Sequence, residues 1–191
     1  MRASAFVAAA LLAACAGGPP PSEWRLNARG ALAQYQLHYF AGATQLAERE
    51  FAQAKAEIAR SGRADLLARA ELVRCAVRTA SLEFDDCPGF ERLRADAGAE
   101  ETAYADYLAG RATRVATQEP LSRLVVAGVQ LKNGTITPTG MSAAVEIASS
   151  QGWRRPLLAW LGVQAARAEQ AGDSDAANRI RRRMELITGG T

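Results

Sequence analysis

Apolar residues recur at intervals of three and four along most of this chain, and single glycines or prolines interrupt the pattern. That spacing places the apolar side chains on one face of an α-helix. Alanine is the commonest apolar residue, whereas aromatic residues make up only 6% of the chain and clusters of strand-favouring Val, Ile and Thr are scarce. Because small side chains let helices approach closely, we predict an all-α fold of packed antiparallel helical hairpins.

The interruptions divide residues 23–191 into a series of expected helices, and this length suits one all-helical domain. The expected segments are Ser22 to Gly42, Leu46 to Ser61-Gly62, Ala64 to Thr79, a short turn from Phe90, Glu100 to Ala109, Pro120 to Asn133-Gly134, Thr137-Pro138 to Gln151, Pro156 to Ala171, and Asp173 or Ser174 to Ile187.

Residues 125–137 allow two interpretations. Asn133-Gly134 either ends the helix that begins at Pro120 or forms the turn of a β-hairpin. We favour the helix, because Pro138 would cut the second strand of a hairpin short.

The N-terminal segment has a cationic start at Arg2, an apolar run from Phe6 to Leu12, and small residues before Cys15. The run is too short to span a bilayer and has the order of a secretory signal. Its end, Leu12-Ala13-Ala14-Cys15, resembles the lipobox of bacterial lipoproteins. The resemblance implies that residues 1–14 are removed as a signal peptide and that Cys15 is acylated on its thiol and its amine.

Residues 15–22 would then be the lipidated cysteine and a Gly/Pro-rich tether that reaches at most about 23 Å. Several acyl chains give lasting attachment, so a membrane is an expected partner. In the lipoprotein family, an aspartate directly after the lipidated cysteine retains the protein in the inner membrane. Ala16 stands at this position, so the resemblance implies the outer membrane and its periplasmic face.

With Cys15 taken by lipid, Cys75 and Cys87 remain, 12 residues apart. In an oxidising periplasm we expect this pair to form a disulfide that ties the loop around Pro88-Gly89 to the helix that carries Cys75. Two free thiols are one alternative. A redox-active pair is the other, although it lacks the Cys-x-x-Cys spacing that lowers a thiol pKa.

A small turn occurs three times between helical segments and ends at Gly42, Gly110 and Gly172. The first two glycines are 68 residues apart, which is twice the period of the tetratricopeptide repeat. Tyr39 to Ala54 resembles the second helix of that repeat. The resemblance implies a TPR-like superhelix with a concave protein-binding face. An irregular bundle is the alternative, because the spacing from Gly110 to Gly172 is 62.

The residue types that common catalytic and metal sites need are scarce. His38 is the only histidine, and neither a nucleophile elbow nor a glycine-rich phosphate loop is present. Asp85-Asp86 and Glu100-Glu101 suit a two-carboxylate glycan hydrolase by type, but neighbouring acids on a helix or turn usually face solvent. The net charge of +3 gives no case for nucleic acid. We therefore expect no catalytic residues, no cofactor and no metal.

Two groups of residues are candidates for partner binding. An arginine cluster near the C-terminus either complements the dipole of the last helix or contacts anionic lipid or an acidic partner. A Trp and Arg group further upstream either packs helices together or forms a binding edge. The candidates are Trp153, Arg154, Arg155, Trp160, Arg181, Arg182 and Arg183.

The lipobox resemblance and the predicted helical fold together indicate an outer-membrane lipoprotein that acts as a non-catalytic protein-binding scaffold or assembly factor. The competing class is an enzyme, or an enzyme activator, of peptidoglycan metabolism. A third class is a carrier with a small-ligand pocket between helices. A scaffold should present a broad groove lined by Tyr, Trp and Arg, whereas an enzyme should gather two carboxylates or His38 in a cleft.

Overall fold

The computed structural model describes residues 22–113 and 118–189. These ranges form helices and connecting turns and contain no strand, so the predicted all-α fold is confirmed. The predicted signal peptide (residues 1–14), the lipobox with Cys15 and the tether as far as residue 21 lie outside the described residues. The helices are α1 (Glu23–Ala41), α2 (Thr44–Ala59), α3 (Ala64–Ala80), α4 (Pro88–Glu91), α5 (Ala99–Leu108), α6 (Pro120–Lys132), α7 (Pro138–Ser150), α8 (Arg154–Gln170) and α9 (Ser174–Gly189), with a 3-10 turn at Arg94–Asp96.

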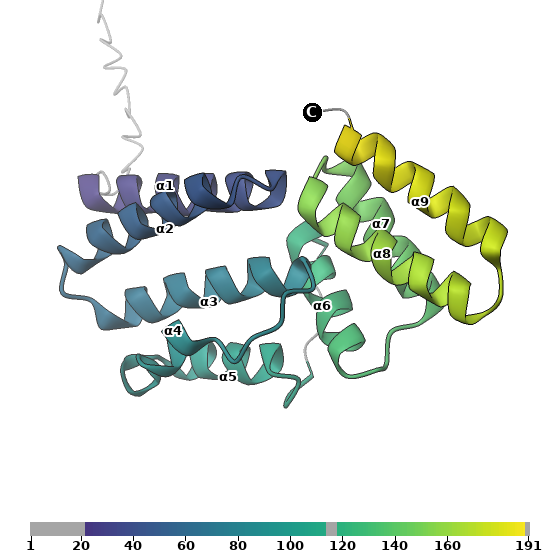
Figure 1. Cartoon of the computed structure of the whole chain (residues 1–191). Coiled ribbons are helices and arrows are strands. Elements are labelled where there is room, and N and C mark those ends of the chain that lie inside the picture. The colour runs from purple at the N-terminus through teal and green to yellow at the C-terminus, as the bar shows by residue number, and fades with distance from the viewer. Residues whose placement is uncertain (1–21, 114–117, 190–191) are drawn as a thin grey trace, which may run out of the picture.

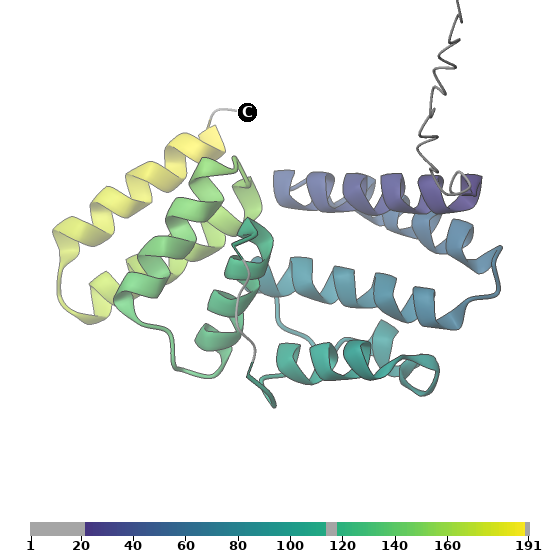
Figure 2. The same ribbon diagram turned by 180° about the vertical axis from the view of Figure 1, so that it is seen from behind.

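The helices form two groups that meet at α6. In the first group α1, α3 and α5 run nearly side by side (Figure 1). Helix α2 lies behind α1 in the view of Figure 2. Helix α6 crosses the end of α3 and leads to the second group, α7 to α9. The pairs α1–α2 and α8–α9 are antiparallel hairpins, but α6 and the long loop after α3 break any regular stacking. The arrangement is therefore an irregular bundle of hairpins.

The segment 125–137 is helical, so the favoured interpretation is confirmed and the β-hairpin is wrong. Helix α6 continues to Lys132, and Gly134 follows in the left-handed conformation with φ 70°. The Thr135 amide then donates to the Gln130 carbonyl at 2.8 Å, a closure typical of helix C-termini. Helix α7 begins where predicted, because the Thr137 hydroxyl accepts a hydrogen bond from the Gly140 amide at 3.0 Å.

Helix α8 begins at Arg154, two residues before the expected start at Pro156. A proline in the first turn of a helix needs no amide hydrogen, so it does not have to be the first residue.

Trp160 lies in the core between the two helix groups. Its side chain is fully buried, and its Nε1–H donates to the carbonyl of Ala80 at 3.2 Å. Tyr35 and Phe40 of α1 are also fully buried in this core. The candidate role of Trp160 at a binding edge is therefore wrong, and its alternative role in helix packing describes it.

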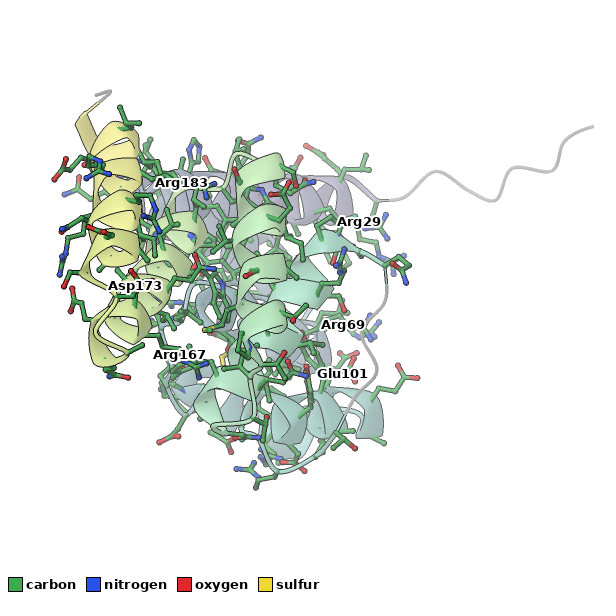
Figure 3. The ribbon with its side chains drawn as sticks, turned by 90° about the vertical axis from the view of Figure 1, so that its right-hand side faces the viewer. Arg29, Arg69, Glu101, Arg167, Asp173 and Arg183 are labelled. Carbon is green, nitrogen blue, oxygen red and sulfur yellow. A yellow bond between two sulfur atoms is a disulfide. The ribbon has the colours of Figure 1, made fainter. Side chains whose placement is uncertain are left out.

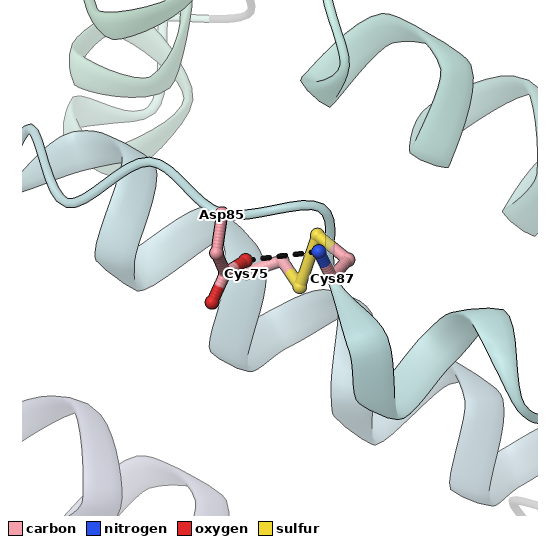
Figure 4. Close-up of side chains that lie close together, drawn as sticks. All are labelled: Cys75, Asp85 and Cys87. Carbon is pink, nitrogen blue, oxygen red and sulfur yellow. Dashed lines mark hydrogen bonds between the residues drawn. A yellow bond between two sulfur atoms is a disulfide. The ribbon is translucent and has the colours of Figure 1, made fainter.

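The predicted disulfide between Cys75 and Cys87 is present. It joins α3 to the loop that precedes α4 (Figure 4). Cys87 has a left-handed backbone (φ 48°), which is unfavourable for a residue with a side chain. The Asp85 carboxylate accepts the Cys87 amide at 2.9 Å and, together with the disulfide, holds this conformation.

Helices α3 and α6 cross at Gly128, and this close approach gives a stability prediction. A Cβ at Gly128 would lie 2.5 Å from the carbonyl oxygen of Thr79, whereas a Cβ at Gly162 in α8 would meet open space. We expect Gly128→Ala to lower the free energy of unfolding by about 1–3 kcal/mol through overpacking. Gly162→Ala should raise it by about 0.5–1 kcal/mol through helix propensity. Urea unfolding followed by circular dichroism measures both, and equal effects would contradict the crossing geometry.

Candidate peptide-binding groove

The predicted Trp and Arg group at the start of α8 serves mainly to hold α8 on the first helix group. The Trp153 ring packs against Phe40 with centroids 4.7 Å apart. Arg155 donates to the Tyr39 carbonyl at 2.8 Å and to the Thr44 hydroxyl at 2.6 Å. It also pairs with Glu83 at 3.0 Å, so one side chain connects α8 to α1, α2 and the loop after α3.

This anchoring role predicts a stability loss on replacement of Arg155. Arg155→Ala would leave the Tyr39 carbonyl and the Glu83 carboxylate without their donor, and its side chain is only 23% exposed. We expect a loss of about 2 kcal/mol, the usual size for charge-assisted hydrogen bonds. The neighbouring Arg154→Ala is the matched control, expected to change stability by less than about 0.5 kcal/mol. A similar loss from both variants in urea unfolding would contradict the assignment.

The arginines of α9 belong to the second helix group. Arg181 pairs with Glu169 of α8 and Arg183 donates to the Ser149 hydroxyl of α7 at 3.1 Å, while Arg182 is exposed. The predicted partner-binding residues therefore do not form one surface. Figure 3 shows Arg183 on the opposite side of the molecule from Arg29, Arg69 and Glu101.

Two neighbouring pockets lie along α3 and share Arg69; together we call them the groove and describe each pocket as one of its lobes. The α1–α3 lobe has a volume of about 310 Å³, with an apolar floor that includes Leu32, Ile58 and Leu66. The α3–α6 lobe has a volume of about 510 Å³, with Val73, Tyr104, Val126 and other apolar residues in its lining. From Leu66 to Ala76, α3 rises about 15 Å, which gives the approximate length of the groove.

The two lobes carry opposite charges at their rims. Arg25, Arg29, Arg63 and Arg69 line the α1–α3 lobe, which has no acidic residue in its lining. The α3–α6 lobe is lined by Glu100, Glu101 and Glu119, with Arg69 as its single base. The groove therefore has a positive end next to α1 and a negative end next to α5 and α6.

Some of these charges are already paired. Arg63 donates to Asp65 at 2.7 Å and lowers the pKa of that carboxyl to about 2. Arg29 makes no hydrogen bond or ion pair within the described residues. The Arg25 guanidinium lies over the Trp24 ring, 5.2 Å from its centroid, a contact that leaves its charge open to an anion.

An ion pair joins the two lobes. The Arg69 Nε of α3 donates to Glu101 Oε1 of α5 at 2.9 Å. Hydrogen bonding from Arg69 lowers the pKa of the Glu101 carboxyl, so this pair stays charged at neutral pH. In Figure 3, Arg29, Arg69 and Glu101 lie one above another on the same side of the molecule.

Arginines lie beside the acidic pairs singled out in the sequence. Asp85, Asp86 and Glu91 share a pocket of about 290 Å³ with Arg94 and Arg111. Arg94 hydrogen-bonds Glu91 and lowers the pKa of that carboxyl, whereas a catalytic general acid needs a raised pKa. Glu101 is similarly held by Arg69.

Cys75, Asp85 and Cys87 lie within 4.8 Å of one another at their ligand atoms (Figure 4). Both sulfurs are joined in the disulfide and no thiolate is available, so a single carboxylate remains as a possible ligand. Asp85 also pairs with Arg78 at 3.4 Å. This cluster therefore fastens the loop after α3 and offers no metal centre.

Comparison of the chain with protein-family models, with curated proteins and with solved structures found no match. Within the described ranges, no helix is long and apolar enough to cross a bilayer. The groove is thus characterised by its own geometry and charge.

The sequence did not reveal the groove, although α3 carried a signal for it. Leu72 and Val73 are adjacent apolar residues whose side chains project about 100° apart on a helix. Both line the α3–α6 lobe, where Leu72 is buried and Val73 remains partly exposed. The apolar face of α3 therefore extends from the core to the groove.

Proposed function

We propose that the protein is an outer-membrane lipoprotein that holds an apolar segment of a partner protein in the groove along α3. The observation that carries the proposal is an open apolar groove whose two ends bear opposite charges. Its length of about 15 Å suits three turns of an amphipathic helix. The lipobox resemblance supports the membrane location. The proposed role is binding and includes no catalytic step.

Charge complementarity specifies the partner segment. An apolar helix with acidic residues at one end and basic residues at the other matches the arginines of the α1–α3 lobe and the glutamates of the α3–α6 lobe. Electrostatic matching of this kind fixes register and orientation more than it raises affinity. We therefore expect selectivity for polarised segments over uniformly charged ones.

Three fluorescent peptides with one apolar centre test this proposal. One has acidic and basic ends, one has two acidic ends, and one has two basic ends. We expect the polarised peptide to bind most tightly in fluorescence anisotropy, by about tenfold. Arg25→Glu with Arg29→Glu should shift the preference to the peptide with two basic ends.

A groove variant and a surface control complete the design. Val73→Glu places a charge in the groove and should abolish binding of all three peptides. Leu46→Glu places the same charge on α2, where Leu46 is 46% exposed and outside the groove, and should leave binding unchanged. Binding of all peptides that is indifferent to Val73→Glu would overturn the groove assignment.

The membrane location has a separate test. Cys15→Ala should release the protein from outer-membrane fractions into the soluble periplasmic fraction, because the acyl chains supply the attachment. Continued membrane attachment of this variant would contradict the lipid anchor without affecting the peptide assay.

A further inference from the structure

Helix α1 has an exposed apolar ridge on the side opposite the core. The ridge consists of Leu26, Gly30, Ala33 and Leu37, which are spaced by four, three and four residues and so share one helix face. Leu26 is 53% exposed and Leu37 is 57% exposed. None of these four residues is charged, but the exposed Glu23 lies on the same face at the start of the helix, three residues before Leu26. Two exposed leucines on one face form a larger apolar surface than a single exposed leucine, which is common on protein surfaces.

The ridge lies next to the expected point of membrane attachment. Helix α1 forms the upper edge of the first helix group in Figure 1, and the described chain begins at Ser22, at the start of this helix. Ser22 is the seventh residue after Cys15, and a segment of this length reaches at most about 23 Å. A lipid on Cys15 would therefore keep one end of the ridge close to the bilayer.

Charge favours a membrane surface on one border of the ridge. Arg25 and Arg29 are exposed and lie between the ridge and the groove, where anionic headgroups would attract them. On the other border, Asn27 and Gln34 are uncharged, and Glu23 in the first turn is the one acid of α1. This distribution is that of a helix lying in the membrane interface, with an apolar line toward the acyl chains.

We propose that the ridge of α1 docks on the surface of the membrane that carries the protein. The proposal rests on the lipid anchor of the proposed function, which brings α1 to the bilayer. Docking along the whole helix fixes the orientation of the molecule, so that the groove opens sideways beside the membrane.

A fluorescent amino acid with a dansyl side chain tests this orientation in the lipidated chain on vesicles of phosphatidylethanolamine and phosphatidylglycerol. The probe replaces Leu26 or Leu37 in the ridge. Leu46 and Phe84 are matched controls, since they are 46% and 39% exposed and lie outside the ridge. We expect a blue shift and several-fold stronger quenching by brominated lipids at positions 26 and 37 than at positions 46 and 84.

Equal quenching at the four positions would overturn the proposal. A blue shift at 26 and 37 that grows with protein concentration in the absence of vesicles would also overturn it, because it would indicate contact between two copies. A chain with Cys15→Ala and a histidine tag directly before residue 15, held on nickel-chelating lipids, keeps the tether length. This chain tests the ridge even where Cys15 itself carries no lipid.

Discussion

Trp160→Ala is expected to lower the free energy of unfolding by about 3–5 kcal/mol, the range measured for large aromatic residues removed from a core. Trp160 is fully buried where α8 meets the first helix group. Its indole nitrogen donates to the carbonyl of Ala80, the last residue of α3. Because α3 ends at Ala80, no following helical turn supplies another donor to this carbonyl. Loss of the Trp160 hydrogen bond therefore adds to the cost of the cavity.

Urea unfolding followed by circular dichroism measures this loss. Trp160→Phe keeps most of the volume but not the hydrogen bond, and should cost less than Trp160→Ala. Trp24→Ala is the surface control, since Trp24 is partly exposed at the groove, and we expect a loss below about 1 kcal/mol. A loss that small for Trp160→Ala would contradict the placement of this residue in the core.

Loss of the disulfide is the second large effect. Cys75→Ala with Cys87→Ala should lower the free energy of unfolding by about 3 kcal/mol, from the chain entropy that a loop of this length gains in the unfolded state. The sequence separation of 12 residues sets the size of that loop. The left-handed backbone of Cys87 offsets part of this cost, because the loop can relax to a more favourable backbone conformation once the covalent link is gone.

Reduction provides an independent measurement of the same effect. Dithiothreitol should destabilise the wild-type protein by as much as the double substitution does, and should leave the double variant unchanged. Mass spectrometry after alkylation, with and without reductant, reports the bond itself. Two freely alkylated thiols in protein prepared from the periplasm would contradict the disulfide.

Much of the fold could be predicted because local signals and packing agree in this chain. Gly42, Gly134 and Gly172 all have positive φ at the ends of predicted helices, which is the conformation that glycine adopts readily. The predicted start of α8 was two residues too late, because Pro156 was taken as the first residue of the helix, which begins at Arg154. The cysteine pair was predictable from redox chemistry together with the expected location.

The groove could not be predicted because it depends on which helices become neighbours. Residues that line it come from α1, α2, α3, α5 and α6, and Arg69 and Glu101 are 32 residues apart. Residue type alone did not separate a packing tryptophan from a surface one, as Trp160 shows. Arg155 is likewise of a type that is usually exposed, but hydrogen bonds to three partners on other elements hold its side chain in place.

The ion pair between Arg69 and Glu101 lies where the two lobes of the groove meet. In the proposed function, an acidic group on the bound segment would compete with Glu101 for Arg69, and a basic group would compete with Arg69 for Glu101. Each exchange frees the partner that the other end of the segment needs. The two charged ends of the segment would therefore bind in a coupled way. A segment with only one matching end would leave either Arg69 or Glu101 without an ion-pair partner.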